Sequence, residues 1–110
     1  MLLKPESVNI LGREYAIQYV SNPAEVDIHR RAALWGQIDC WTRSIRVYDN
    51  GRRLDDILEV LLHEVIHGIA TELNIKTLND SEDDLHLLSV GLADVLVRNG
   101  WIELKGGNQQ

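Results

Sequence analysis

The stretch Leu61-Leu62-His63-Glu64-Val65-Ile66-His67-Gly68 decides how the rest of this 110-residue chain is interpreted. On an α-helix, residues four apart lie one above the other, so His63 and His67 point the same way and both reach one metal ion. Glu64 lies about a quarter-turn from His63, where a carboxylate can polarise a metal-bound water without binding the metal itself. This spacing is typical of zinc hydrolases.

The residues around this motif are apolar on nearly every side of the expected helix. They are Ile57, Leu58, Val60, Leu61, Leu62, Val65, Ile66, Ile69 and Ala70. A helix that is apolar all round is buried in a core, where two histidines and a glutamate are costly unless something compensates them. A bound metal would do so. The alternative is that His63 and His67 are ordinary core histidines with hydrogen-bond partners.

Length and composition fit one globular domain. Hydrophobic residues make up 45% of the chain and charged residues 25%, and the net charge of −6 disfavours binding to nucleic acid or to an anionic membrane. The single cysteine, Cys40, cannot form an internal disulfide, and no segment has the length of a signal peptide or a membrane span. We therefore expect a cytoplasmic protein with one domain over residues 1–105 and a disordered tail over residues 106–110.

Four strands are predicted before the long helix. Residues 8–11 and 14–20 read as a hairpin with its turn at Gly12-Arg13, and residues 35–39 and 43–48 read as two more strands. Residues 24–33 form a polar connection between the pairs. The order of elements predicts an α+β fold, with a small sheet of three or four strands, antiparallel or mixed, packed on the helices.

Two helices are predicted in the second half of the chain. The first covers residues 52–73 and carries the His-Glu-x-x-His motif, and the second covers residues 82–98 after a short connection at 75–78 and a capping residue within 79–81. The apolar stripe expected to bury the second helix is Leu85, Leu88, Leu92, Val95 and Leu96. The apolar residues beyond it, expected to return as a strand or to pack on the helices, are Trp101, Ile102 and Leu104.

Two imidazoles leave a zinc ion in need of a third protein ligand, and the candidates lie at the start of the second helix. At 100° per residue, Asp83 points nearly opposite the apolar stripe and Asp84 lies on its far flank. Glu82 and His86 share the other flank, and Glu82 lies closer to the buried face, so we prefer Glu82. The alternative for Glu82 is a first-turn carboxylate that only complements the helix dipole.

These features together resemble the small phage and prophage zincins. The likeness is carried by His63-Glu64-Val65-Ile66-His67, by the strand 44–48 before it, and by a helix that begins Glu82-x-x-Leu85 and closes with residues 91–99. Small zincins of this kind are minimal metallopeptidase domains related to the SprT-like and ImmA/IrrE-like families and to the gluzincins. The likeness covers roughly residues 35–99.

The resemblance implies a zinc-dependent peptidase, acting on a protein or peptide substrate in the cytoplasm of a host cell if the chain is phage-encoded. His63 and His67 would be ligands, Glu64 the general base and Glu82 the third ligand. Gluzincins place an Asp four residues after the ligand Glu, where it orients a ligand His. This chain has His86 there, which either takes the orienting role or is itself the third ligand, as a His is in the SprT-like branch.

In the expected chemistry, zinc lowers the pKa of its bound water, Glu64 takes the proton, and the hydroxide attacks a peptide carbonyl. Tyr48, His29 and Arg46 are candidates to stabilise the oxyanion. Cys40 is a weaker candidate metal ligand, because a lone Cys beside a Trp is more typical of a small buried hydrophobe.

The alternative function is a zinc-binding regulatory or interaction module with little or no activity. Glu64 argues against that reading, because a structural zinc site needs no general base. The sequence does not predict the oligomeric state.

Overall fold

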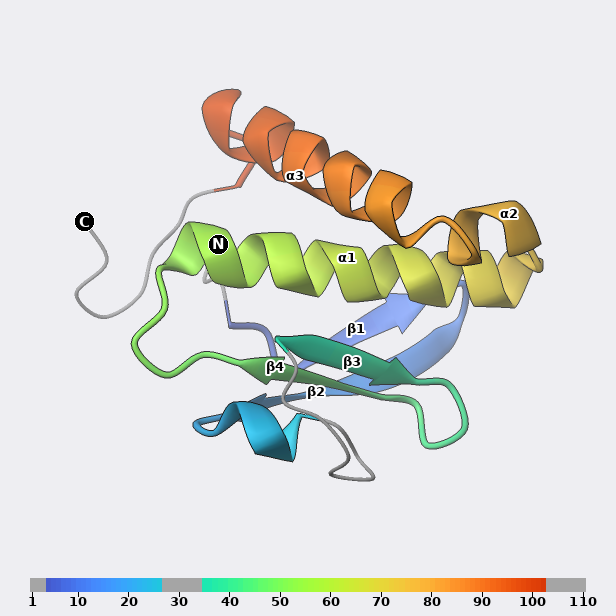
Figure 1. Ribbon diagram of the computed structural model, residues 1–110, viewed down its shortest axis with the longest axis horizontal. Helices are drawn as coiled ribbons and strands as arrows, with labels where there is room; N and C mark the ends of the chain where they lie inside the picture. The colour runs from blue at the N-terminus through green and yellow to red at the C-terminus, as the bar shows by residue number, and fades with distance from the viewer. Residues whose placement is uncertain (1–3, 27–34, 103–110) are drawn as a thin grey trace.

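The computed structural model describes residues 4–26 and 35–102, which form a small α+β unit of three layers. A four-stranded sheet is the first layer, helix α1 (Leu54–Leu73) crosses one face of it, and helix α3 (Glu82–Arg98) covers the other side of α1 (Figure 1). The predicted α+β class is confirmed. The tail predicted to be disordered lies outside the described residues.

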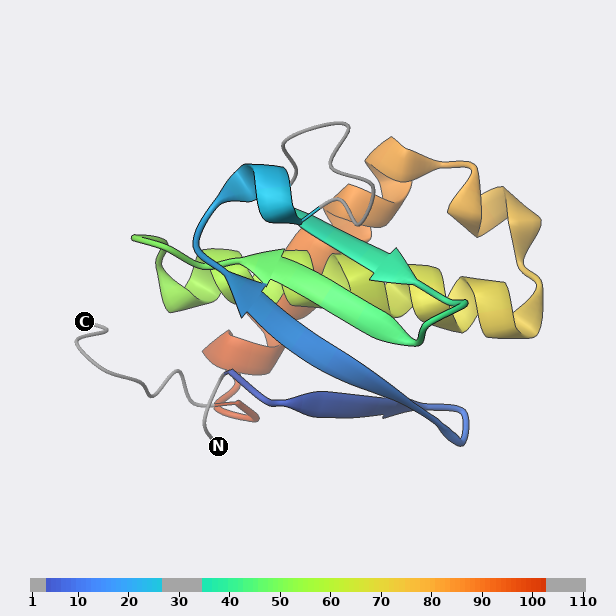
Figure 2. The same ribbon diagram turned by 90° about the horizontal axis from the view of Figure 1, so that it is seen from below.

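The sheet is mixed and is built from two hairpins laid side by side. Strands β1 (Ser7–Ile10) and β2 (Arg13–Val20) are antiparallel, as are β3 (Gly36–Asp39) and β4 (Ser44–Tyr48). The hairpins join through a parallel pairing of β2 with β4, which gives the order β1-β2-β4-β3 (Figure 2). Strand β3 is therefore an edge strand within the described part of the chain. Both hairpins were predicted, but the parallel pairing of β2 with β4 was not.

The first hairpin turns one residue earlier than predicted, at Leu11-Gly12. Both residues have positive φ, 53° and 89°, as the tight two-residue turn between antiparallel strands requires. The side-chain oxygen of Asn9 accepts a hydrogen bond from the Gly12 N–H at 2.8 Å. Glycine carries no penalty at positive φ, so Gly12 belongs inside the turn and Arg13 starts the strand.

Helix α1 lies in the middle of the fold, which explains why its sequence is apolar on nearly every side. It begins at Leu54, two residues later than predicted, and ends before Asn74, whose φ of 58° is left-handed. A Cβ at Gly68 would lie 2.8 Å from the side chain of Ile10 and 2.9 Å from that of Ile38. Glycine therefore lets α1 sit close to the sheet. No helix of the described residues is long and apolar enough to cross a membrane.

The predicted connection after α1 contains one further helical turn, α2 (Lys76–Asn79). Beyond α3, Ile102 packs against the core and Trp101 is 70% exposed. The described part of this segment forms no strand, and Leu104 lies outside it.

Helix α3 has the predicted bounds, but of its predicted buried stripe only Leu85 is fully buried. It packs on α1 through Leu85, Ser89 and Ala93, two of which are small enough for a close approach of the helices. Leu88, Leu92 and Val95, expected in the core, are 51%, 38% and 42% exposed, and Leu96 is half-buried. The apolar stripe and the packed face therefore share Leu85 and diverge along the rest of the helix.

Candidate metal centre

His63, His67 and Glu82 bring three potential ligand atoms within 4.8 Å of one another. The Nε2 atom of His63 lies 2.5 Å from Glu82 Oε1, and the Nε2 atom of His67 lies 3.1 Å from Glu82 Oε2. Helix α1 supplies both imidazoles one turn apart, and α2 turns the chain back so that the first residue of α3 reaches them. The three residues predicted to bind metal are thus brought together.

His67 is held in one orientation by Asn79, a residue that the sequence pattern suggested only as a cap. Its Nδ1 atom lies 2.8 Å from the side-chain oxygen of Asn79, whose amide nitrogen donates to the Thr71 hydroxyl at 3.1 Å. That second bond fixes the amide with its oxygen towards the ring, so Nδ1 carries the hydrogen and donates it. Without a metal, Nε2 donates its hydrogen to Glu82; once that proton is lost, the lone pair of Nε2 faces the Glu82 oxygens, as in metal sites where an outer group sets the tautomer.

Local electrostatics favour the metal-binding protonation state at two of the three residues. These are His63 and Glu82, and His67 is the exception. Burial lowers the pKa of His63, which keeps that imidazole neutral. Partial burial alone would raise the pKa of Glu82, but hydrogen bonds with His63 and His67 outweigh it and hold that pKa below its usual value. For His67, burial lowers the pKa, and hydrogen bonds with Asn79 and Glu82 more than reverse the effect. A metal ion would therefore displace a proton mainly at His67.

Glu64 is a buried carboxylate beside this group and outside it. It is 8% exposed, and burial raises its pKa to about 7 although the backbone N–H of Ile38 donates a hydrogen bond to it. Strand β3 lies so close to α1 here that a Cβ at Gly36 would meet Val60 Cγ1 at 2.5 Å and Glu64 Oε2 at 3.3 Å. The carboxylate is therefore held between α1 and the edge strand.

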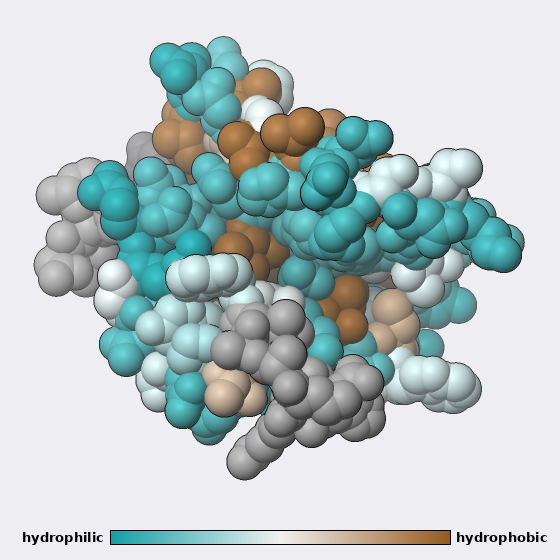
Figure 3. Space-filling model, viewed as in Figure 1, coloured by the Kyte–Doolittle hydropathy of each residue, from teal (hydrophilic) through white to brown (hydrophobic). Residues whose placement is uncertain are grey.

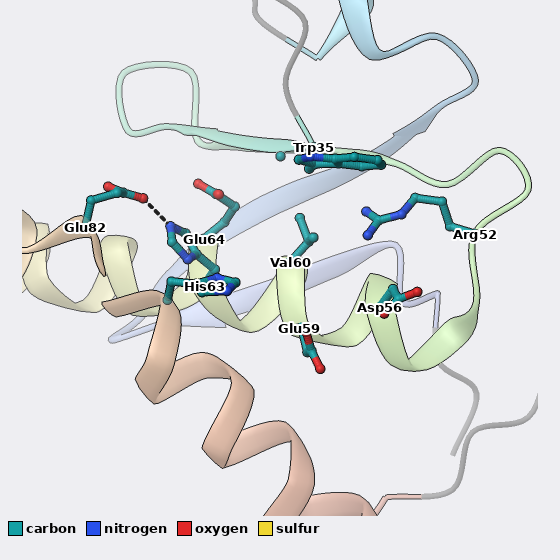
Figure 4. A pocket seen from close by; sticks show the side chains of 10 residues that line it. Trp35, Arg52, Asp56, Glu59, Val60, His63, Glu64 and Glu82 are labelled. Atoms are coloured by element: carbon teal, nitrogen blue, oxygen red, sulfur yellow. Dashed lines mark hydrogen bonds and ion pairs between the residues drawn. The ribbon is translucent and has the colours of Figure 1, made fainter. Parts of the chain in front are cut away.

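A pocket of about 360 Å³ opens beside His63 and Glu64 and runs along α1 (Figure 4). Its far end is formed by Arg52, whose guanidinium lies over the Trp35 ring at 4.0 Å. The buried Nη1 atom of Arg52 has no hydrogen-bond partner among the described residues. Sequence reasoning missed both residues, because they lie on opposite sides of a hairpin and carry no common motif.

The other residues singled out from the sequence do not join the donor group. The ring of His86 lies 6.0 Å from that of His63 and lines the pocket, and Asp83 and Asp84 are exposed. Cys40 packs against the hydrophobic core.

Two of the three oxyanion candidates do not line the pocket. Tyr48 lies against Trp35 with ring centroids 5.6 Å apart, and Arg46 donates to the Glu25 carbonyl at 2.8 Å. His29 lies outside the described residues.

The donor set suits zinc. Two imidazole nitrogens and a carboxylate oxygen are ligands that zinc binds at about 2.0–2.2 Å, and in a tetrahedral site such ligands lie roughly 3.3–3.5 Å apart. The contacts of His67 with the two Glu82 oxygens, at 3.1 and 3.4 Å, are close to that spacing. The 2.5 Å contact with His63 is a hydrogen bond that an ion would replace. Among the described residues, this group offers zinc three donors, one fewer than a closed structural site uses.

Comparison of the chain with protein-family models, with curated proteins and with solved structures finds no match. The function of the site is therefore inferred from its own residues.

Proposed function

We propose that this chain is a zinc-dependent peptidase with a zincin-like site, in which His63, His67 and Glu82 hold the ion. The observation that carries the proposal is the position of Glu64. A buried carboxylate that adjoins three metal-binding side chains without belonging to their group is typical of a general base, and a purely structural site has no use for one.

A zinc ion bound there would supply Lewis acidity and a water of lowered pKa. Glu64 would accept the proton of the attacking water and return it to the leaving amine. In the metal-free protein burial raises the pKa of Glu64 to about 7, and the positive charge of a zinc ion nearby would lower it and favour the carboxylate form that accepts the proton. The hydrogen bond from Ile38 and the tight contact at Gly36 hold the carboxylate in place.

Strand β3 supports an extended peptide as substrate. The Tyr48 N–H bonds to the Trp35 carbonyl, so in the antiparallel register Gln37 and Asp39 also face β4. Gly36 and Ile38 then direct their backbone groups to the outer edge of the sheet, where the Ile38 N–H donates to Glu64, and the Gly36 groups and the Ile38 carbonyl face the position of an added strand. A peptide that pairs with this edge lies along the pocket, which favours unfolded or flexible segments over folded proteins.

The test compares wild type with Glu64→Gln and with the matched control Glu59→Gln. Both glutamates are on α1, both line the pocket, and burial raises the pKa of each. Glu64→Gln should reduce hydrolysis of denatured proteins and peptides on the order of a hundredfold, the scale for a general base, and keep one zinc per chain. Glu59→Gln should retain activity within about threefold.

The same experiment distinguishes the alternative, a zinc-binding regulatory module. If wild type and Glu64→Gln hold equal zinc and are equally inactive on every substrate, the peptidase proposal is wrong. If neither binds zinc, both proposals are wrong.

A further inference from the structure

Helix α3 exposes an apolar surface on the side that faces away from α1. Leu87 and Leu88 are 66% and 51% exposed, and Figure 3 shows hydrophobic side chains gathered along this helix. Contiguous exposed apolar surface of this kind marks association sites in soluble proteins. We define the outer face of α3 by its exposed residues Asp84, Leu87, Leu88, Gly91, Leu92, Val95 and Arg98.

Charge and side-chain size are arranged symmetrically about Gly91 on this face. Asp84 precedes Gly91 by seven residues and Arg98 follows it by seven, and Leu87 and Val95 lie four residues to either side. Two copies of α3 packed antiparallel around an axis at Gly91 would therefore place Asp84 of each opposite Arg98 of the other. Leu87 would meet Val95 in the same way.

We propose that the outer face of α3 is a twofold interface between two copies of this chain, with the helices antiparallel and crossing at Gly91. Among residues 4–26 and 35–102, nothing lies within 4 Å of the position that a Cβ would take at Gly91, so this part of the structure leaves the bare backbone open to a second helix. A parallel pair is disfavoured because it would bring together two first turns that each carry Glu82, Asp83 and Asp84.

The area of the outer face of α3 indicates how tightly two copies can bind. A helix of 17 residues is about 25 Å long, and an apolar strip about 10 Å wide buries roughly 250 Å² per copy. Stable complexes bury about 800 Å² per partner, so the dimer should be weak, with a dissociation constant in the micromolar range. The outer face shares no residue with the pocket, and dimerisation can be tested apart from zinc binding.

Sedimentation equilibrium from about 1 to 200 µM tests the interface, a range that brackets the expected dissociation constant. Wild type should pass from monomer to dimer with rising concentration. Leu88→Glu should weaken the dimer at least about tenfold, since it buries a charge opposite apolar side chains. The matched control is Leu73→Glu, on an equally exposed leucine at the end of α1, which should dimerise like wild type. Circular dichroism checks that both variants are folded.

Charge reversal tests the antiparallel arrangement. Asp84→Arg places two cations opposite each other and should weaken the dimer severalfold, and adding Arg98→Asp should restore most of the loss. Full recovery is not expected, because Arg98 also pairs with Asp94 at 2.9 Å within its own helix.

Crosslinking tests the position of the axis, in a Cys40→Ser background that removes the only native cysteine. Helices packed 8–10 Å apart leave roughly 4–5 Å between the Cα atoms at a crossing, which a disulfide can span. Gly91→Cys should therefore link to its own copy. Leu87→Cys should not, because each copy lies about 6 Å along the helix from the axis.

Three results would overturn the proposal: a monomer at every concentration, a dimer that Leu88→Glu leaves intact, or self-linking of Leu87→Cys in preference to Gly91→Cys. A monomer would leave the face to a different protein or to another part of this chain.

Discussion

Helices α1 and α3 pack against each other, but they differ in which side chains they expose. Helix α1 buries polar side chains, and helix α3 exposes apolar ones. Helix α1 buries the carboxylate of Glu64 and leaves His63 and His67 only 14% and 17% exposed. Helix α3 exposes Leu87 and Leu88 by more than half. Charged groups are rarely buried without partners, and clustered leucines are rarely left in water without a function.

The positions of the helices explain the difference. Because α1 lies between the sheet and α3, a polar group on its buried faces needs a partner inside the protein, and the three polar residues of its motif, His63, Glu64 and His67, lie around one site. Because α3 is the outermost layer of the described structure, neither the sheet nor α1 covers its exposed apolar residues. This contrast is the basis of the two proposals, a metal site on α1 and an association surface on α3.

The largest expected effect is on zinc affinity, which should depend on α1 and not on the outer face of α3. His67→Ala removes a direct ligand and should weaken zinc binding by more than a hundredfold, since even the loss of an outer partner commonly costs tenfold or more. Leu88→Ala, on the outer face of α3, should leave zinc affinity unchanged. Competition with a chromogenic chelator measures both variants. Equal affinities for wild type and His67→Ala would place the metal elsewhere.

The next effect concerns the stability of the metal-free protein. Folding buries Glu64 and raises its pKa from 4.5 to about 7. The folded protein therefore binds a proton at Glu64 more tightly than the unfolded chain does. The stability gained from protonation is complete below about pH 4.5 and is lost as pH rises to about 7, a decrease of up to about 3 kcal/mol.

Glu64→Gln removes this dependence. Its free energy of unfolding should exceed that of wild type by up to about 3 kcal/mol at pH 8 and by little at pH 4.5. Leu88→Gln, on the exposed side of α3, should change stability by no more than about 0.5 kcal/mol at either pH. Urea titrations in the presence of a chelator measure all three proteins. A constant difference between wild type and Glu64→Gln across this range would contradict the assigned pKa.

The smallest effect tests how α1 is supported by its neighbour α2. Asn79→Ala removes the acceptor that holds Nδ1 of His67 and should weaken zinc binding about tenfold. Asn79→Asp keeps an acceptor there and should restore affinity to at least the wild-type value. If both variants bind zinc like wild type, the hydrogen bond does not orient the ligand.

The donor group was predictable because helical geometry alone places residues four apart on one face. His63, Glu64 and His67 needed only their spacing, and Glu82 followed from its position on the second helix. Asn79 was not predictable in its role, since the one-turn helix that carries it has no periodicity. Trp35 and Arg52 meet because the pairing of β3 with β4 brings the start of β3 next to the end of β4, a long-range contact that no motif marks.

The fold, like the site, was predictable only in part. Alternating residues and turn signals indicate each hairpin, but nothing in the sequence between the two hairpins indicates that β2 and β4 pair in parallel. The error on α3 has a different cause. The largest apolar residues suggested the buried face, whereas close packing on α1 selected Ser89 and Ala93 for their small size.

The most direct test of the central claim is X-ray absorption at the zinc edge on protein loaded with one equivalent of zinc. We expect two imidazole nitrogens at about 2.0–2.1 Å, with oxygen from Glu82 and solvent completing the shell, and loss of one imidazole in His67→Ala. Three imidazoles would show that His86 replaces Glu82, and a sulfur neighbour near 2.3 Å would place the ion at Cys40. Failure to bind zinc at all would contradict the account entirely.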